Sequence, residues 1–193
     1  MPFVPMAYAV AGQIASSTEY NKVVDNVNDL DARVTGLSMT RPYVHVYQSS
    51  TGTQSIANTT ATAINFNAEV IDNPSGTGFH STVSNISRIV PTVAGRYFVW
   101  GSVCFPASGT GSFLAQIRKN GAVLLGAAPY QDKQLYTSGF VALSAQCHAT
   151  VFCNGTTDYF ELWTNQNSGG SLTTFSNATD QHSALIAFYL GAS

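Results

Sequence analysis

The 193-residue sequence has very few charged side chains. Lysine and arginine together number 8, aspartate and glutamate 10, and charged residues make up 9% of the chain, against roughly a quarter in ordinary soluble domains. The formal net charge is −2, and Arg118-Lys119 is the largest cluster of cations. Binding of nucleic acid through phosphate neutralisation is therefore not expected. A surface so poor in charge is either covered in an assembly or kept in solution by serine, threonine, asparagine and glycine, and we expect both.

Cysteine and long apolar runs are also scarce. Cys104, Cys147 and Cys153 are an odd number and form no Cys-x-x-Cys pair, which argues against a zinc site and a disulfide framework; we expect small buried side chains. No run reaches the roughly 18–20 apolar residues of a membrane span, so we expect no membrane insertion. The apolar stretch 3–15 follows no positive charge and is interrupted by Pro5, so we expect no signal peptide.

Motifs for catalysis are lacking as well. The four histidines are dispersed, and no Gly-x-Ser-x-Gly, His-Glu-x-x-His, phosphate-binding loop or dinucleotide loop occurs. From residue 41 onward there are six carboxylates, of which Asp72 and Asp180 are the candidates for a calcium loop. We therefore predict no enzyme activity, no metal site and no cofactor.

An amphipathic segment does stand near the start of the chain. Apolar residues recur there at spacings of three and four, and we interpret them as the seam of a coiled coil: Tyr20, Val23, Val27, Leu30, Val34 and Leu37. Ser16 and Glu19 fit a capping box, and Pro42 prevents continuation of the helix. We predict a helical stalk over residues 16–40 that buries its seam against copies of itself. A lone helix packed on its own head is the alternative.

From residue 41 onward the sequence is typical of β-structure, with short apolar runs separated by turn signals such as Asn73-Pro74 and Asn120-Gly121. The run 96–105 has apolar residues on both faces, which indicates a strand covered by a facing sheet and by a neighbouring subunit. We interpret Trp100 and Trp163 as core residues of such strands. The predicted strands are 43–47, 63–67, 86–90, 96–105, 113–119, 122–125, 136–143, 149–152, 159–164 and 184–190. We therefore predict an all-β sandwich or jelly-roll head over residues 41–193.

Four segments of this region resemble the globular head of complement component one q: Pro91–Val99, Ile117–Gly121, Asp158–Leu162 and His182–Gly191. The order and spacing of the four segments match that family, and the resemblance covers about residues 43–191. It implies a ten-strand jelly roll shared with tumour-necrosis-factor-like heads. It also implies a homotrimer about a hydrophobic axis, to which Tyr97, Val99 and Phe188 would contribute.

The N-terminal part resembles the starts of small fibre and minor tail proteins of tailed bacteriophages. Ala11-Gly12, Tyr20-Asn21 and 29–34 carry this resemblance. It implies that residues 1–15 form an extended arm, which together with the stalk anchors the chain to other virion proteins through residues 1–40. The first hypothesis is therefore a trimeric fibre, spike or decoration protein of capsid or tail, assembled in the host cytoplasm, with a head directed at the host surface.

The competing hypothesis is a secreted, complement-head-like lectin trimer. Its candidate ligand loops are rich in asparagine, serine, threonine and glycine and contain His80, Tyr130 and Tyr136. Such side chains bind a cell-surface glycan by stacking and hydrogen bonding. The alternative is that these loops are ordinary polar loops and that their aromatic residues pack within the trimer.

Overall fold

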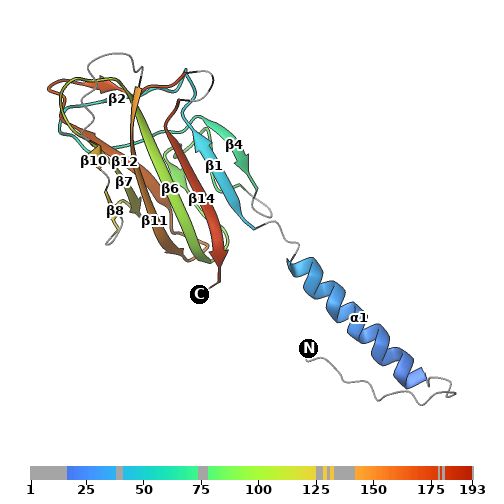
Figure 1. The fold of residues 1–193 in the computed structure, drawn as a ribbon. Coiled ribbons are helices and arrows are strands. Elements are labelled where there is room, and N and C mark those ends of the chain that lie inside the picture. Colours follow the sequence, from blue (N-terminus) through green and yellow to red (C-terminus); the bar gives the residue numbers. More distant parts are fainter. Residues whose placement is uncertain are drawn as a thin grey trace. The chain divides into compact units, whose positions relative to one another are not determined.

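The computed structural model describes residues 17–37, 41–73, 78–124, 128–129, 131–132, 142–177, 179 and 181–192. By its internal contacts the chain divides into two compact units, Met1–Met39 and Thr40–Ser193. The first unit is helical and the second is a β-sheet head (Figure 1).

The helical unit contains α1 (Ser17–Leu37), so the predicted stalk is helical over most of its length. Ser16, the predicted cap, lies outside the described residues. Val23, Val27 and Leu30 are 40%, 57% and 57% exposed in the single chain. The backbones of Tyr20, Val34 and Leu37 belong to α1, but their side chains are not among those described. No helix of the described residues is long and apolar enough to cross a membrane.

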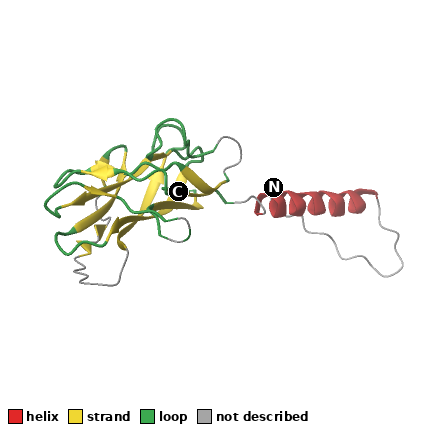
Figure 2. Ribbon diagram, turned by 90° about the horizontal axis from the view of Figure 1, so that it is seen from above, coloured by secondary structure: helices red, strands yellow, loops and turns green. Residues whose placement is uncertain are grey.

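The head is built from β-sheets (Figure 2), and their paired strands are antiparallel. Its first sheet has the strand order β4-β1-β14-β6-β11-β9. In Figure 1 the last strand, β14 in red, lies between β1 in cyan and β6 in green. Non-consecutive strands are thus neighbours throughout. The bounds are β1 (Tyr43–Tyr47), β4 (Ala68–Asp72), β6 (Gly95–Pro106), β9 (Ala128–Pro129), β11 (Ala142–Cys153) and β14 (Ala184–Gly191).

The second sheet has the order β10-β7-β12-β3, with β5 paired to β12 and β8 paired to β7. A short third sheet joins β13 to β2. The bounds are β2 (Ser55–Ile56), β3 (Thr62–Ala63), β5 (Arg88–Ile89), β7 (Phe113–Lys119), β8 (Ala122–Val123), β10 (Gln131–Asp132), β12 (Phe160–Gln166) and β13 (Leu172–Thr173).

The core lies between the inward faces of the two larger sheets. Period-two alternation places Val99 of β6, Ile117 of β7 and Leu162 of β12 in it, all fully buried. The two sheets pack closely at Gly101, where an added Cβ would lie 2.6 Å from Cδ1 of Leu162. Cys104, Cys147 and Cys153 are buried, as predicted, and none of the three forms a disulfide bond.

Two predicted strands, 43–47 and 113–119, have the same bounds as β1 and β7. The prediction of separate strands at 136–143 and 149–152 was wrong within the described residues, because β11 runs unbroken from Ala142 to Cys153. Polar residues such as Gln146 and His148 alternate there with buried Ala145 and Cys147. They occupy the outward face of the strand and do not end it.

Candidate functional site

The outward face of the six-stranded sheet carries a row of aromatic side chains. Partners directly opposite in a sheet face the same side, so the register aligns three aromatic residues and one threonine across β1, β14, β6 and β11: Tyr43, Phe188, Phe98 and Thr150. The rings of Tyr43 and Phe188 stack with centroids 4.6 Å apart. Phe188 is nevertheless 43% exposed. The row is therefore an aromatic ridge that one chain leaves partly in water.

A second row runs parallel to the first across the same four strands: His45, Ile186, Trp100 and His148. The two rows touch where the rings of Phe98 and His148 stack at 6.0 Å. Leu190, at the end of β14, extends the apolar surface and is half exposed. Neither row contains a lysine, arginine, aspartate or glutamate. We call Tyr43, His45, Phe98, Trp100, Ile186 and Phe188 the apolar face.

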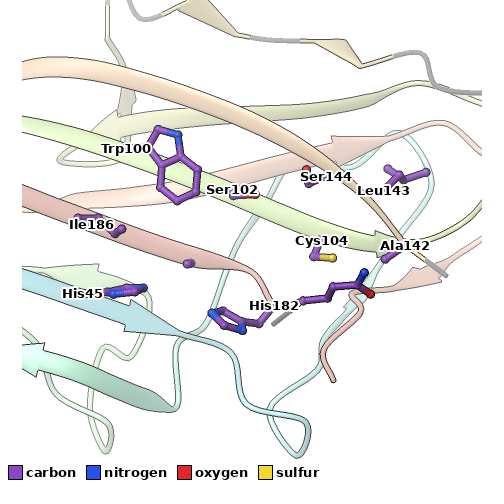
Figure 3. Close-up of a pocket in the computed structure, with 11 residues that line it drawn as sticks. His45, Trp100, Ser102, Cys104, Ala142, Leu143, Ser144, His182 and Ile186 are labelled. Atoms are coloured by element: carbon purple, nitrogen blue, oxygen red, sulfur yellow. The ribbon is translucent and has the colours of Figure 1, made fainter. Parts of the chain in front are cut away.

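A shallow pocket of about 360 Å³ opens beside the second row (Figure 3). Trp100, Ile186 and His45 border it from three neighbouring strands, and His182 lines it as well. The ring of His182 also contacts Tyr47, with centroids 4.9 Å apart. Burial, and then the nearby His182, lower the pKa of His45 below its ordinary value. The neutral imidazole is therefore the favoured form of His45 in this surface.

A second hollow of about 340 Å³ lies at the other end of the face, lined by Arg41, Pro42, Tyr43, Phe98, Phe188, Tyr189 and Leu190. Neither hollow is lined by a carboxylate. Among the described residues, no group of three or more histidine, cysteine, aspartate or glutamate side chains is placed to hold a metal ion. The surface is suited to being covered by another apolar surface.

The residues predicted for the trimer contact separate into two groups. Tyr97 and Val99 are fully buried in the core of their own head, and a side chain without exposed surface cannot contact another copy. For these two residues the prediction is corrected. Their neighbours Phe98 and Trp100 occupy the outward face of β6 instead, whereas Phe188 lies on the apolar face and its contact stays a prediction. Alternation along residues 96–105 distinguished two faces, but both are apolar and no sequence signal said which one the second sheet covers.

Both tryptophans differ from the prediction that they are core residues. Trp100 and Trp163 are partly exposed and belong to the outward faces of the two sheets. Trp163 packs under Arg118, whose Cζ lies 4.0 Å from the centroid of its ring. This pair was missed because it depends on the register between β7 and β12.

The candidate ligand residue His80 has a structural position. Its side chain is fully buried, with Nδ1 2.8 Å from Oε1 of Glu69 and Nε2 3.1 Å from the carbonyl oxygen of Ile86. Both ring nitrogens are thus engaged within the chain, and a role in ligand binding is not supported. Tyr130 and Tyr136 lie outside the described residues.

No protein-family model and no curated protein matches the chain. Among solved structures, murine APRIL at pH 5.0 is similar, with a TM-score of 0.50 and 10% identity over 76% of this chain and 98% of that chain. Eiger TNF from S. frugiperda has a TM-score of 0.48 and 13% identity over 79% and 96%. PRD1 vertex protein P5 has a TM-score of 0.46 and 17% identity over 78% and 98%.

At such identities the likeness is one of fold. It confirms the predicted all-β jelly roll of the tumour-necrosis-factor-like kind, preceded by a short helix. The number of ten strands, the homotrimer, the narrower resemblance to complement component one q and the phage-like anchor stay predictions.

Proposed function

We propose that the chain is a virion structural protein of a tailed bacteriophage. It is a homotrimeric fibre, spike or decoration protein that is held in the particle by residues 1–40 and displays the jelly-roll head towards the host surface. The observation that carries the self-association in this proposal is that each of the two units leaves apolar side chains exposed in the single chain.

In the helical unit the uncovered stripe is the predicted seam. Val23, Val27 and Leu30 are at heptad spacing and exposed, and a heptad stripe is buried by packing against other helices. The sequence of α1 is rich in asparagine and aspartate, which have low helix propensity, so the stability of this helix comes mainly from packing of its apolar stripe. A copy of the same helix is the partner that matches the stripe in length and spacing.

In the head the uncovered surface is the apolar face. Its two rows contain no charge, and Phe188 and Leu190 add large exposed apolar side chains. Contiguous surfaces of this kind are rare on monomers and mark contact sites. Association of identical chains would cover the stripe and the apolar face together, since every chain supplies both. The heptad alone does not decide between two and three chains; the resemblance to complement-type heads favours three.

The assignment to a virion is supported by the phage-like features of the N-terminal part and by the low charge of the chain. It can be tested with antibodies raised against the head. Purified particles of the phage that carries this gene should be labelled by immunogold at regular positions. Full-length protein should bind to particles that lack the protein, and deletion of residues 1–40 should prevent this binding. Recovery of the protein as a free trimer in the culture medium, with unlabelled particles, would contradict the proposal and favour the secreted lectin.

A further inference from the structure

An arginine–aromatic cluster lies on the outward face of the second sheet. The register pairs Glu161 of β12 with Arg88 of β5 on one side and with Arg118 of β7 on the other. A carboxylate is therefore flanked across the sheet by two guanidinium groups. Trp163 is two residues beyond Glu161 and faces the same side, and Tyr159 precedes β12. We call Arg88, Arg118, Tyr159, Glu161 and Trp163 the arginine patch.

Both guanidinium groups are held against aromatic rings. Cζ of Arg118 lies 4.0 Å from the ring centroid of Trp163, and Cζ of Arg88 lies 4.1 Å from that of Tyr159. Nε of Arg118 donates to Oε1 of Gln116 at 3.1 Å, and Nε of Arg88 donates to Oε1 of Glu161 at 3.2 Å. Stacking and these Nε bonds limit the orientations of both side chains before any ligand arrives, which lowers the entropy cost of binding.

Both oxygens of the Glu161 carboxylate already accept hydrogen bonds within the chain. Oε1 accepts hydrogen bonds from Ser87 Oγ at 3.0 Å and Arg88 Nε at 3.2 Å, and Oε2 accepts one from Trp163 Nε1 at 3.0 Å. Glu161 is buried, so it stays in place as the support of the patch. One negative and two positive charges leave the patch with a net positive charge. In the described part of the chain, Arg88 and Arg118 hydrogen-bond through Nε, which leaves their terminal amino groups as donors for an anion.

We propose that the arginine patch binds an anionic saccharide. Guanidinium groups recognise carboxylate and phosphate in a forked geometry, and the amides of Gln116 and Asn165, which share this face by strand alternation, supply donors and acceptors for sugar hydroxyls. A single net charge suits one acidic group better than a polyanion such as nucleic acid. The patch lies on the opposite side of the sandwich from the apolar face, so assembly through that face leaves it accessible. The inference that this saccharide belongs to the envelope of the host cell rests on the proposed function.

The two tryptophans allow a site-specific test on the full-length chain. With 5-fluorotryptophan incorporated, ¹⁹F NMR reports Trp163 in the patch and Trp100 on the other sheet, and Trp163→Phe assigns the two signals. Digalacturonic acid and galactose 1-phosphate carry the carboxylate and phosphate versions of the ligand; digalactose and inorganic phosphate are the controls. We expect at least one acidic saccharide to shift the Trp163 signal saturably while the Trp100 signal stays fixed.

Arg118→Gln keeps the side chain long and polar but removes the charge, and should weaken this binding at least tenfold. Arg88→Gln is the second variant, and Arg96→Gln is the matched control because Arg96 is exposed on the other sheet. An unchanged Trp100 signal shows that a variant is folded. The proposal is overturned if neither acidic saccharide shifts the Trp163 signal or if digalactose or inorganic phosphate binds equally well. It is also overturned if Arg118→Gln and Arg88→Gln bind no more weakly than the control Arg96→Gln. Such a result leaves the mass and particle-labelling tests of the proposed function unaffected.

Discussion

The ammonium nitrogen of Lys119 lies 2.8 Å from Oδ2 of Asp158. This ion pair joins the end of β7 to the segment that leads into β12. Asn120 donates from Nδ2 to Oδ1 of the same carboxylate at 2.8 Å, and the backbone N–H of Asn154 donates to Oδ2 at 2.9 Å. Asn120 has a φ of 53°, as the tight Asn-Gly hairpin requires. Asp158 therefore holds together two turns that lie far apart in the sequence.

We predict that Asp158→Asn destabilises the head in a pH-dependent way. Burial acts to raise the pKa of the Asp158 carboxyl, but hydrogen bonds from Lys119, Asn120 and Asn154, with the Lys119 charge, lower it overall. Because the folded pKa lies below the unfolded one, the stabilisation is present above about pH 4 and is lost as the pH falls through the folded pKa. Urea unfolding should show a gap between parent and variant at neutral pH that closes in acid. A gap that is constant down to acid pH would contradict this role, and Asp25→Asn on α1 is the control.

We predict that Gly101→Ala destabilises the head by about 1–3 kcal/mol, because the added methyl group overpacks the core. Its Cβ would lie 2.6 Å from Cδ1 and 3.2 Å from Cδ2 of Leu162. Gly109→Ala is the matched control, since an added Cβ there has no heavy atom within 4 Å. Shortening the opposing side chain in a Leu162→Val background should relieve part of the penalty. Equal unfolding midpoints for the two glycine variants would show that the sheets do not approach as described.

Strand positions could be predicted from the sequence where alternation is strict, as at 43–47 and 113–119. Contacts between side chains of different strands could not be predicted in this way. Both faces of β6 are apolar, so its alternation did not reveal that Tyr97 faces the core while Phe98 faces outward. The partner of His80 is Glu69 on the edge strand β4, which has an acidic residue at its second position and no strand signal of its own. The arginine patch likewise depends on the pairing of Arg118 with Glu161, which is fixed by the register of β7 and β12.

We predict that the head becomes less stable as the pH falls below about 6.5, the ordinary histidine value. Burial and His182 lower the pKa of His45, so the folded state binds fewer protons than the unfolded state. The stability that depends on neutral His45 is present above the unfolded pKa and lost as the pH falls towards the folded one. Thermal unfolding of the parent should shift downward between neutral pH and about pH 5. His45→Asn should reduce this shift; an unchanged pH profile would assign the effect to other groups.

We predict that the helix strengthens an assembly that the head can form by itself. Replacing Val27 and Leu30 with aspartate places charges in the exposed stripe of α1 and should lower its helix content, because the seam no longer packs against copies. The mass of the full-length variant should still be that of a trimer at high concentration. Asp25→Ala and Asn28→Asp, outside the seam, are the controls. A monomeric double variant would mean that the helix, and not the head, holds the chains together.

The most direct test of the account is the mass of the full-length protein by light scattering, compared with that of Phe188→Asp. Phe188 is exposed, and it stacks on Tyr43 at the centre of the aromatic ridge. The account predicts three times the 20.5 kDa chain mass for the parent and a concentration-dependent fall towards the single-chain mass for the variant, with an unchanged circular dichroism spectrum. A monomeric parent, or a Phe188→Asp trimer as tight as the parent, would contradict assembly through the apolar face.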